Sequence, residues 1–145
     1  MDNELRCVFN AKLSNIKVAR SIGQIFFSEL DSSISFMNEI KTIISEAVTN
    51  AIIHGCMNDE AMDVYMNLSY DKNFIYIEVI DKGVGILDIE LAKTPMFTTK
   101  PFDERSGLGF TIMDVFSDEM MIESSLGEGC MVKIIKKINQ IKDDM

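Results

Sequence analysis

The sequence predicts an α+β sandwich, in which helices pack against one face of a sheet. The order of expected elements carries this prediction: a strand, two helices, a hairpin, a long loop, a helix and a second hairpin. The composition, 47% hydrophobic and 26% charged residues with two prolines, is typical of a folded chain. The length of 145 residues lies near the commonest domain size, so we expect one domain over 1–145.

The first half of the chain predicts one strand and two helices. Residues 5–9 indicate a short strand, and Ser14 is expected to cap a helix that reaches about residue 30. Ser35 is expected to cap the second helix, which continues to about residue 54 and ends at Gly55. At 100° per residue, the second helix gathers one apolar stripe that should face the core. This stripe consists of Phe36, Ile40, Ile43, Ile44, Ala47, Val48 and Ala51.

The second half predicts two hairpins on either side of a long loop and a helix. Alternation over 64–70 and 74–80, around a turn at 71–73, indicates the first hairpin. The next segment, up to residue 106, shows little periodicity beyond a short helix at 88–93, and such segments are often lids or binding loops. Two further elements follow. They are a helix from Gly107 with Leu108, Ile112, Val115 and Phe116 at core spacing, and a hairpin of strands 120–124 and 130–136.

Charge and composition argue against several classes of function. A formal net charge of −9 disfavours nucleic acid as a partner, because its binding draws on clusters of Lys and Arg. Charged residues interrupt the first twenty positions, and no run of roughly 18 apolar residues occurs, so we expect a cytoplasmic protein without a membrane span. Three cysteines predict reduced thiols, and the single histidine, His54, cannot form a histidine-rich metal site alone.

Glu46 and Asn50 are the first candidates for chemistry. They lie four residues apart and therefore one above the other, along the edge of the apolar stripe of the second helix. Asn50 could supply a hard oxygen to Mg²⁺, and Glu46 could accept a proton from an attacking hydroxyl. A solvated pair on the exposed side of an amphipathic helix would have the same spacing, so the spacing alone leaves both interpretations open.

Two glycine-containing segments are the next candidates. DKGVGI (81–86) follows a strand and places two glycines where the backbone must bend or approach a ligand, although a strand-ending turn would look alike. RSGLGF (105–110) places glycines at the mouth of a helix, where free N–H groups favour phosphate, although a simple helix-starting loop would be similar. The GxGxxG signature would need a glycine where Ile112 stands, and GxxxxGK[ST] is absent, so Rossmann and P-loop interpretations are disfavoured.

Taken in order, four segments resemble the boxes of the GHKL ATPase and kinase superfamily. They are SEAVTNAIIHG (45–55), DKGVGI, FTTK (97–100) and RSGLGF. The similarity covers nearly the whole chain and is greatest to the serine-kinase branch that contains the sporulation anti-sigma factors. The resemblance implies a two-layer α/β sandwich of the Bergerat type, with a mixed, mostly antiparallel sheet, helices on one face, and ATP held between that face and a lid.

The resemblance also implies a set of site residues. Glu46 would be the general base, Asn50 the Mg²⁺ ligand, and Asp81 the acceptor for the adenine amino group. The family pattern would place the remaining residues around the nucleotide. These are Gly83 and Gly85 in the adenine pocket, Gly55 and Ile86 as further nucleotide-binding residues, Thr98, Thr99 and Lys100 in the lid, and Arg105, Ser106, Gly107, Leu108 and Gly109 around the phosphates.

The sequence departs from the family pattern at one position, and it matches the family at one position used to bind partners. Family members commonly place a threonine after the final glycine near the nucleotide, whereas Cys130 follows Gly129 here, and a thiol is a weaker hydrogen-bond partner. Arg20, on the first helix, matches a position used in partner binding, although an exposed helix arginine would look the same. The implied partners are a sigma factor, an anti-anti-sigma factor whose serine accepts the phosphate, and a second copy of the chain.

Three other functions remain to be weighed. A sensor histidine kinase would need a phosphoacceptor histidine on its own helix, and His54 lies inside the nucleotide box instead. Topoisomerase, chaperone and mismatch-repair relatives carry large further domains that 145 residues cannot contain. The main alternative is a non-catalytic module that binds ATP only to hold a sigma factor, and the presence of Glu46 disfavours it.

Overall fold

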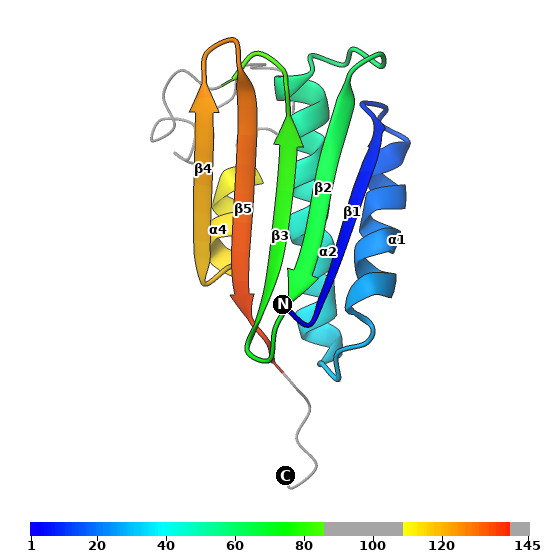
Figure 1. Ribbon diagram of the computed structural model, residues 1–145, viewed down its shortest axis with the longest axis vertical. Coiled ribbons are helices and arrows are strands. Elements are labelled where there is room, and N and C mark those ends of the chain that lie inside the picture. The colour runs from blue at the N-terminus through cyan, green and yellow to red at the C-terminus, as the bar shows by residue number, and fades with distance from the viewer. Residues whose placement is uncertain (86–108, 140–145) are drawn as a thin grey trace, which may run out of the picture.

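The protein folds into two layers, a sheet and the helices that cover one of its faces (Figure 1). The computed structural model describes residues 1–85 and 109–139. The predicted two-layer sandwich is confirmed by this arrangement. The short helix expected at 88–93 lies outside the described residues.

The sheet has five described strands in the order β1-β2-β3-β5-β4, and every pairing between them is antiparallel. Both predicted hairpins are present. Their register places Asp81, at the end of β3, opposite Cys130, near the start of β5. The strands are β1 (Asn3–Asn10), β2 (Asp63–Tyr70), β3 (Phe74–Asp81), β4 (Glu119–Ser125) and β5 (Gly129–Lys137).

In the part of the chain that the structure describes, three α-helices lie behind the sheet in the view of Figure 1. The longest, α2, crosses the middle of the sheet, with α1 on one side and α4 on the other. A single turn of π-helix, η1, continues α2 without a break. The bounds are α1 (Asn15–Phe27), α2 (Ile34–Asn50), η1 (Ala51–Gly55) and α4 (Gly109–Phe116).

The core lies between α2 and the helix-facing side of the sheet. All seven residues of the predicted stripe on α2 are buried, so the helical periodicity identified the core face correctly. Alternate residues of β2 and β3 meet them from the sheet. This packing fixes α2 in its rotation about its own axis, which determines where the edge of the stripe points.

Three details of the helices differ from the sequence predictions. Ser33, not Ser35, caps α2, because its side chain accepts a hydrogen bond from the Phe36 N–H at 3.1 Å. The α-helical part ends at Asn50, with the wider turn η1 replacing the last turn expected before Gly55. Val115 is 72% exposed, and Met113 occupies the core position of α4 instead.

No helix among the described residues is long and apolar enough to cross a membrane.

Candidate functional site

Glu46, Asn50 and Gly109 come together where the end of α2 meets the start of α4, and we call them the Glu46 cluster. A Cβ on Gly109 would lie 2.9 Å from Asn50 Nδ2, 3.2 Å from Asn50 Oδ1 and 3.3 Å from Glu46 Oε2. The side chains of α2 therefore reach the backbone at the N-terminal end of α4. Only a glycine leaves the space between them open.

The amide of Asn50 has an unusual environment in this cluster. Its Nδ2 atom is buried and makes no hydrogen bond to any residue that the structure describes. A buried amide without a partner costs about 1–3 kcal/mol, and such groups are rare in folded proteins. A ligand or an ordered water that paired with this amide would remove the cost, so the cluster has the character of a binding site rather than of a solvated helix face.

The turn η1 connects the Glu46 cluster to the end of β3. A π-turn inserts one extra residue into a helix, and such turns occur frequently at functional sites. Here it begins directly after Asn50 and ends at Gly55, which lies against the side chain of Asp81. One continuous segment, residues 46–55, therefore carries the predicted base and metal ligand at one end and contacts the predicted adenine acceptor at the other.

Asp81, Gly55, Gly83 and Cys130 form a second group, which we call the Asp81 cluster. Asp81 is 5% exposed, and its Oδ1 accepts a hydrogen bond from the Gly83 N–H at 2.9 Å. A Cβ on Gly55 would collide with the Asp81 carboxylate, and one on Gly83 would collide with the Gly55 carbonyl oxygen. Both glycines are thus required by the close approach of η1 to Asp81 and to the loop after β3.

Burial governs the electrostatics of the Asp81 cluster. It raises the pKa of Asp81 above its ordinary value, against the opposing effect of hydrogen bonds from the Gly83 and Cys130 backbone N–H groups. Burial, together with the nearby Asp81 carboxylate, also raises the pKa of Cys130 to about 12 and that of Cys56 to about 11. Both thiols therefore stay protonated at neutral pH, and Cys130 remains a weak hydrogen-bonding group beside Asp81.

Backbone hydrogen bonds hold the loop after β3 in place. The Val84 N–H donates to the Gly55 carbonyl at 3.0 Å, and the Gly127 N–H donates to the Val84 carbonyl at 2.6 Å. Gly85 follows with a φ of +77°, and a Cβ at this position would collide with the Ser125 carbonyl oxygen, so only glycine fits. The loop is therefore tied both to η1 and to the turn between β4 and β5.

The donor atoms of the Glu46 cluster fit a magnesium ion that carries most of its other ligands with it. Mg²⁺ is usually bound by one or two protein oxygens together with waters and phosphate oxygens. Asn50 Oδ1 is one such oxygen, and the described residues contain no group of three or more metal-ligating side chains that would form a closed protein cage. The residues present therefore suit a metal that arrives with a polyphosphate.

Arg20 is an exposed residue of α1. Its Nη1 donates to the Ser45 hydroxyl at 3.4 Å, a long contact to the residue that precedes Glu46. Most of the guanidinium donors therefore remain available to a partner.

Eight predicted site residues lie outside the described residues. They are Ile86, Thr98, Thr99, Lys100, Arg105, Ser106, Gly107 and Leu108. Two further participants were not predicted from the sequence. Cys56 contributes its thiol next to Asp81, and Gly129 adopts a φ of +95° with its Cα against the Asp81 carbonyl. The position of Cys56 directly after Gly55 was the signal that could have identified it.

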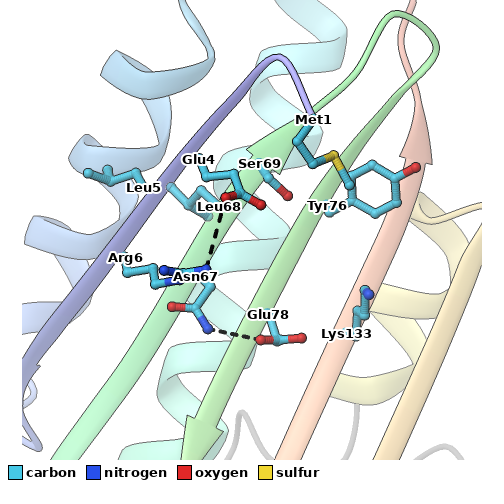
Figure 2. A pocket seen from close by; sticks show the side chains of 10 residues that line it. All are labelled: Met1, Glu4, Leu5, Arg6, Asn67, Leu68, Ser69, Tyr76, Glu78 and Lys133. Atoms are coloured by element: carbon cyan, nitrogen blue, oxygen red, sulfur yellow. Dashed lines mark hydrogen bonds and ion pairs between the residues drawn. The ribbon is translucent and has the colours of Figure 1, made fainter.

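A shallow hollow lies on the opposite face of the sheet, which the described helices leave uncovered (Figure 2). Polar side chains from four strands line it, and Asn67 Nδ2 donates to Glu78 Oε1 there at 2.9 Å. Arg6 and Glu4 form a long ion pair of 3.9 Å between exposed side chains. Because these residues pair with one another at the surface, the hollow lacks the unsatisfied buried group that marks the Glu46 cluster.

Comparison with known proteins agrees with this geometry. Residues 9–136 match the family model of the histidine kinase-like ATPase domain, a domain that binds ATP. The chain is 44% identical to the anti-sigma F factor of Geobacillus thermodenitrificans, over 98% of this chain and 97% of that protein. It is 46% identical to the anti-sigma F factor of Geobacillus stearothermophilus, over 94% of this chain and 93% of that protein.

A solved structure supports the fold. The crystal structure of the RsbU and RsbW domains of Rv1364c from Mycobacterium tuberculosis superposes with a TM-score of 0.64 at 19% identity. The match covers 99% of this chain and 35% of that longer chain, so it bears on the fold alone. On the family match and the extent of the curated similarity, the chain belongs to the histidine kinase-like ATPase family and, within it, to the anti-sigma F factors.

Proposed function

We propose that the chain, as one domain over 1–145, is an anti-sigma factor and an ATP-dependent protein serine kinase. It binds and inhibits a sporulation sigma factor, and it transfers the γ-phosphate of ATP to a serine of an anti-anti-sigma factor. The observation that carries the kinase proposal is the meeting of Glu46, Asn50 and Gly109 at the mouth of α4. The similarity to anti-sigma F factors over nearly the whole chain supports the proposed partners.

The two clusters have different roles in this proposal. Asp81 accepts a hydrogen bond from the adenine amino group, while Gly55 and Gly83 let η1 and the loop after β3 pack closely around that carboxylate and hold it in place. Gly109 exposes the first N–H groups of α4 to the phosphates, where the helix dipole favours negative charge. Because η1 lies between the two clusters, the adenine ring and the reacting phosphate bind at opposite ends of it.

The chain's own described residues have two roles in the reaction, proton transfer and positioning of the phosphates. Glu46 accepts the proton of the serine hydroxyl as that oxygen bonds to the γ-phosphorus, and the bond to the bridging oxygen of ADP breaks. Asn50 orients its Oδ1 toward the phosphates. When bound, Mg²⁺ neutralises the charge on the phosphate oxygens. The residues expected at 98–100 and 105–108, outside the described part of the chain, would complete the phosphate contacts.

We also propose that Arg20 contributes to the surface that holds the partners. It is exposed on α1, and its contact with the Ser45 hydroxyl is long, so its guanidinium is accessible to a partner. A homodimer that holds one sigma factor follows from the family resemblance.

Incubation with γ-labelled ATP and candidate anti-anti-sigma proteins, followed by mapping of the modified residue, tests the kinase proposal. The expected result is label on one serine, which appears far more slowly with Glu46→Gln. Label on a histidine of the chain itself would instead indicate a histidine kinase. If ATP binds and a sigma factor is retained but no label is transferred to any candidate, the non-catalytic module is the better description.

A further inference from the structure

Lys136 is the one buried cation among the residues that the structure describes, and it is 8% exposed. It lies near the end of β5 on the helix-facing side of the sheet, following Val132 and Ile134 at alternate positions. Its Nζ contacts two groups at 2.6 Å each, the Oε1 of Glu39 on α2 and the carbonyl oxygen of Phe116 on α4. The same ammonium lies 5.4 Å from the centre of the Phe36 ring. One side chain therefore joins three elements.

The contact with Phe116 satisfies the last residue of α4. The final carbonyls of a helix have no partner within the helix, and they carry the negative end of its dipole. An ammonium placed against such a carbonyl is favourable on both counts, and here the group is shielded from water. Lys136 therefore fixes the C-terminal end of α4 beside the C-terminal end of β5.

The opposite end of α4 forms part of the Glu46 cluster. The helix has only eight residues and is about 12 Å long at 1.5 Å per residue. A helix of this length is marginal alone, so its position depends on contacts to α2 and the sheet. Figure 1 shows it running behind β4 and β5. Met113 is its fully buried side chain. A shift at Phe116 would thus be transmitted along a short rigid element to Gly109.

We propose that Lys136 is a positioning residue for the triphosphate. By holding Phe116, it keeps the N-terminal backbone of α4 at the distance from Glu46 and Asn50 that the phosphates require. This inference rests on the proposed placement of the phosphates at Gly109. It predicts that removing Lys136 weakens recognition of the phosphates while recognition of the base at Asp81 is unchanged.

A purely structural ion pair would behave differently, and a double variant separates the two. Lys136→Met alone leaves Glu39 without its cation, which destabilises the fold whatever the role of Lys136. Lys136→Met with Glu39→Leu removes the pair as a whole, and such replacements are often neutral for stability. The Phe116 carbonyl still loses its donor in the double variant. Glu39→Gln is the matched control, because it keeps an acceptor for Lys136 and leaves the Phe116 contact in place.

The test measures melting temperature and the affinities for ATP and adenosine by calorimetry in the full chain. For Lys136→Met and for the double variant we expect ATP affinity to fall by about tenfold, as for the loss of one charge-assisted hydrogen bond, with adenosine affinity unchanged. The double variant should recover the melting temperature but not the ATP affinity, and Glu39→Gln should resemble the unaltered protein.

Two results would overturn the inference. One is ATP affinity that returns together with the melting temperature in the double variant, and the other is an equal loss of ATP and adenosine binding. Because the readout is binding, it stands apart from the kinase proposal. Failure of the unaltered protein to label a serine would count against that proposal, while the ATP-to-adenosine comparison would still decide the role of Lys136.

Discussion

The Asp81 cluster and the Glu46 cluster lie at the two ends of one short segment, yet their polar groups are satisfied in opposite ways. The Asp81 carboxylate already accepts hydrogen bonds from the backbone N–H groups of Gly83 and Cys130, and neighbouring backbone encloses it closely. Asn50, in contrast, buries an Nδ2 atom that no described residue satisfies. The Asp81 end is satisfied within the protein, and the Glu46 end keeps one buried donor that no described residue satisfies.

Under the proposed function, this difference gives the two ends separate tasks. The rigidly held Asp81 carboxylate would select the base, because only a group that donates a hydrogen bond matches it. An incompletely satisfied edge instead gains its partners when phosphates and metal bind, so its interactions are available for transfer chemistry. Variants at the Glu46 cluster should therefore affect transfer, and variants at the Asp81 cluster should affect binding.

The largest effect is expected for Glu46→Gln, which removes the proton acceptor but keeps the shape of the side chain. We expect phosphoryl transfer to slow by roughly 10²- to 10⁴-fold, the usual contribution of a general base. ATP affinity should be unaffected. Single-turnover labelling with calorimetry of the same sample measures both, and an unchanged transfer rate would remove Glu46 from the chemistry.

Asp81→Asn should give the complementary result. The lost charge-assisted hydrogen bond is expected to weaken ATP binding by about 10- to 100-fold. Calorimetry measures this loss, and equal affinity would exclude Asp81 from base recognition.

The stability of the same variant provides a control with a defined sign. Burial raises the pKa of Asp81, so above its folded-state pKa the ionised carboxylate lowers the free energy of unfolding. This loss of stability disappears as the pH falls below the ordinary pKa range of Asp. Removing the charge should therefore leave the nucleotide-free protein about as stable as before at neutral pH. A large loss of stability at neutral pH would show that Asp81 supports the fold rather than the ligand.

Gly55→Ala tests whether the closeness of η1 and Asp81 matters. The added Cβ collides with the carboxylate, so we expect a loss of about 1–3 kcal/mol in unfolding free energy and weaker ATP binding. Gly127→Ala is the matched control, since its Cβ meets nothing within 4 Å although its φ is +81°. Chemical denaturation and calorimetry of both should show a binding defect in Gly55→Ala alone.

The smallest effect is expected for Asn50→Leu in the absence of nucleotide. Replacing the unsatisfied amide by an apolar group of similar size should raise the unfolding free energy by about 1 kcal/mol. The stabilisation that the normal protein gains from ATP with Mg²⁺ should be lost. Thermal melts with and without nucleotide measure both quantities, and a destabilised nucleotide-free variant would mean that the amide already has a partner.

The sequence predicted most of the fold because its periodicities are strong. The stripe on α2 contains seven apolar residues at helical spacing, and all are buried as expected. Cap positions were less certain, since Ser33 and Ser35 differ by only two positions and both are serines. The π-turn η1 was not predicted, because its last residue, Gly55, packs against the Asp81 carboxylate and approaches Gly83, and both are distant from it in sequence.

The site was predicted in its components but not in its connections. Spacing placed Glu46 and Asn50 on one helix edge, whereas their approach to Gly109 depends on how α4 packs on α2. Lys136 was read only as part of a strand. The alternation of Val132, Ile134 and Lys136 does place it on the inner face, but its contacts with Glu39 and Phe116 join residues 97 and 20 positions away. The single domain over 1–145 stays a prediction.

The most direct test of the division between the two clusters is a crystal structure of the full chain with Mg²⁺ and a non-hydrolysable ATP analogue. The account predicts the adenine amino group at the Asp81 carboxylate, the phosphates at the N-terminus of α4, and the metal at Asn50 Oδ1. A nucleotide bound with its phosphates toward Asp81, or bound away from both clusters, would contradict it.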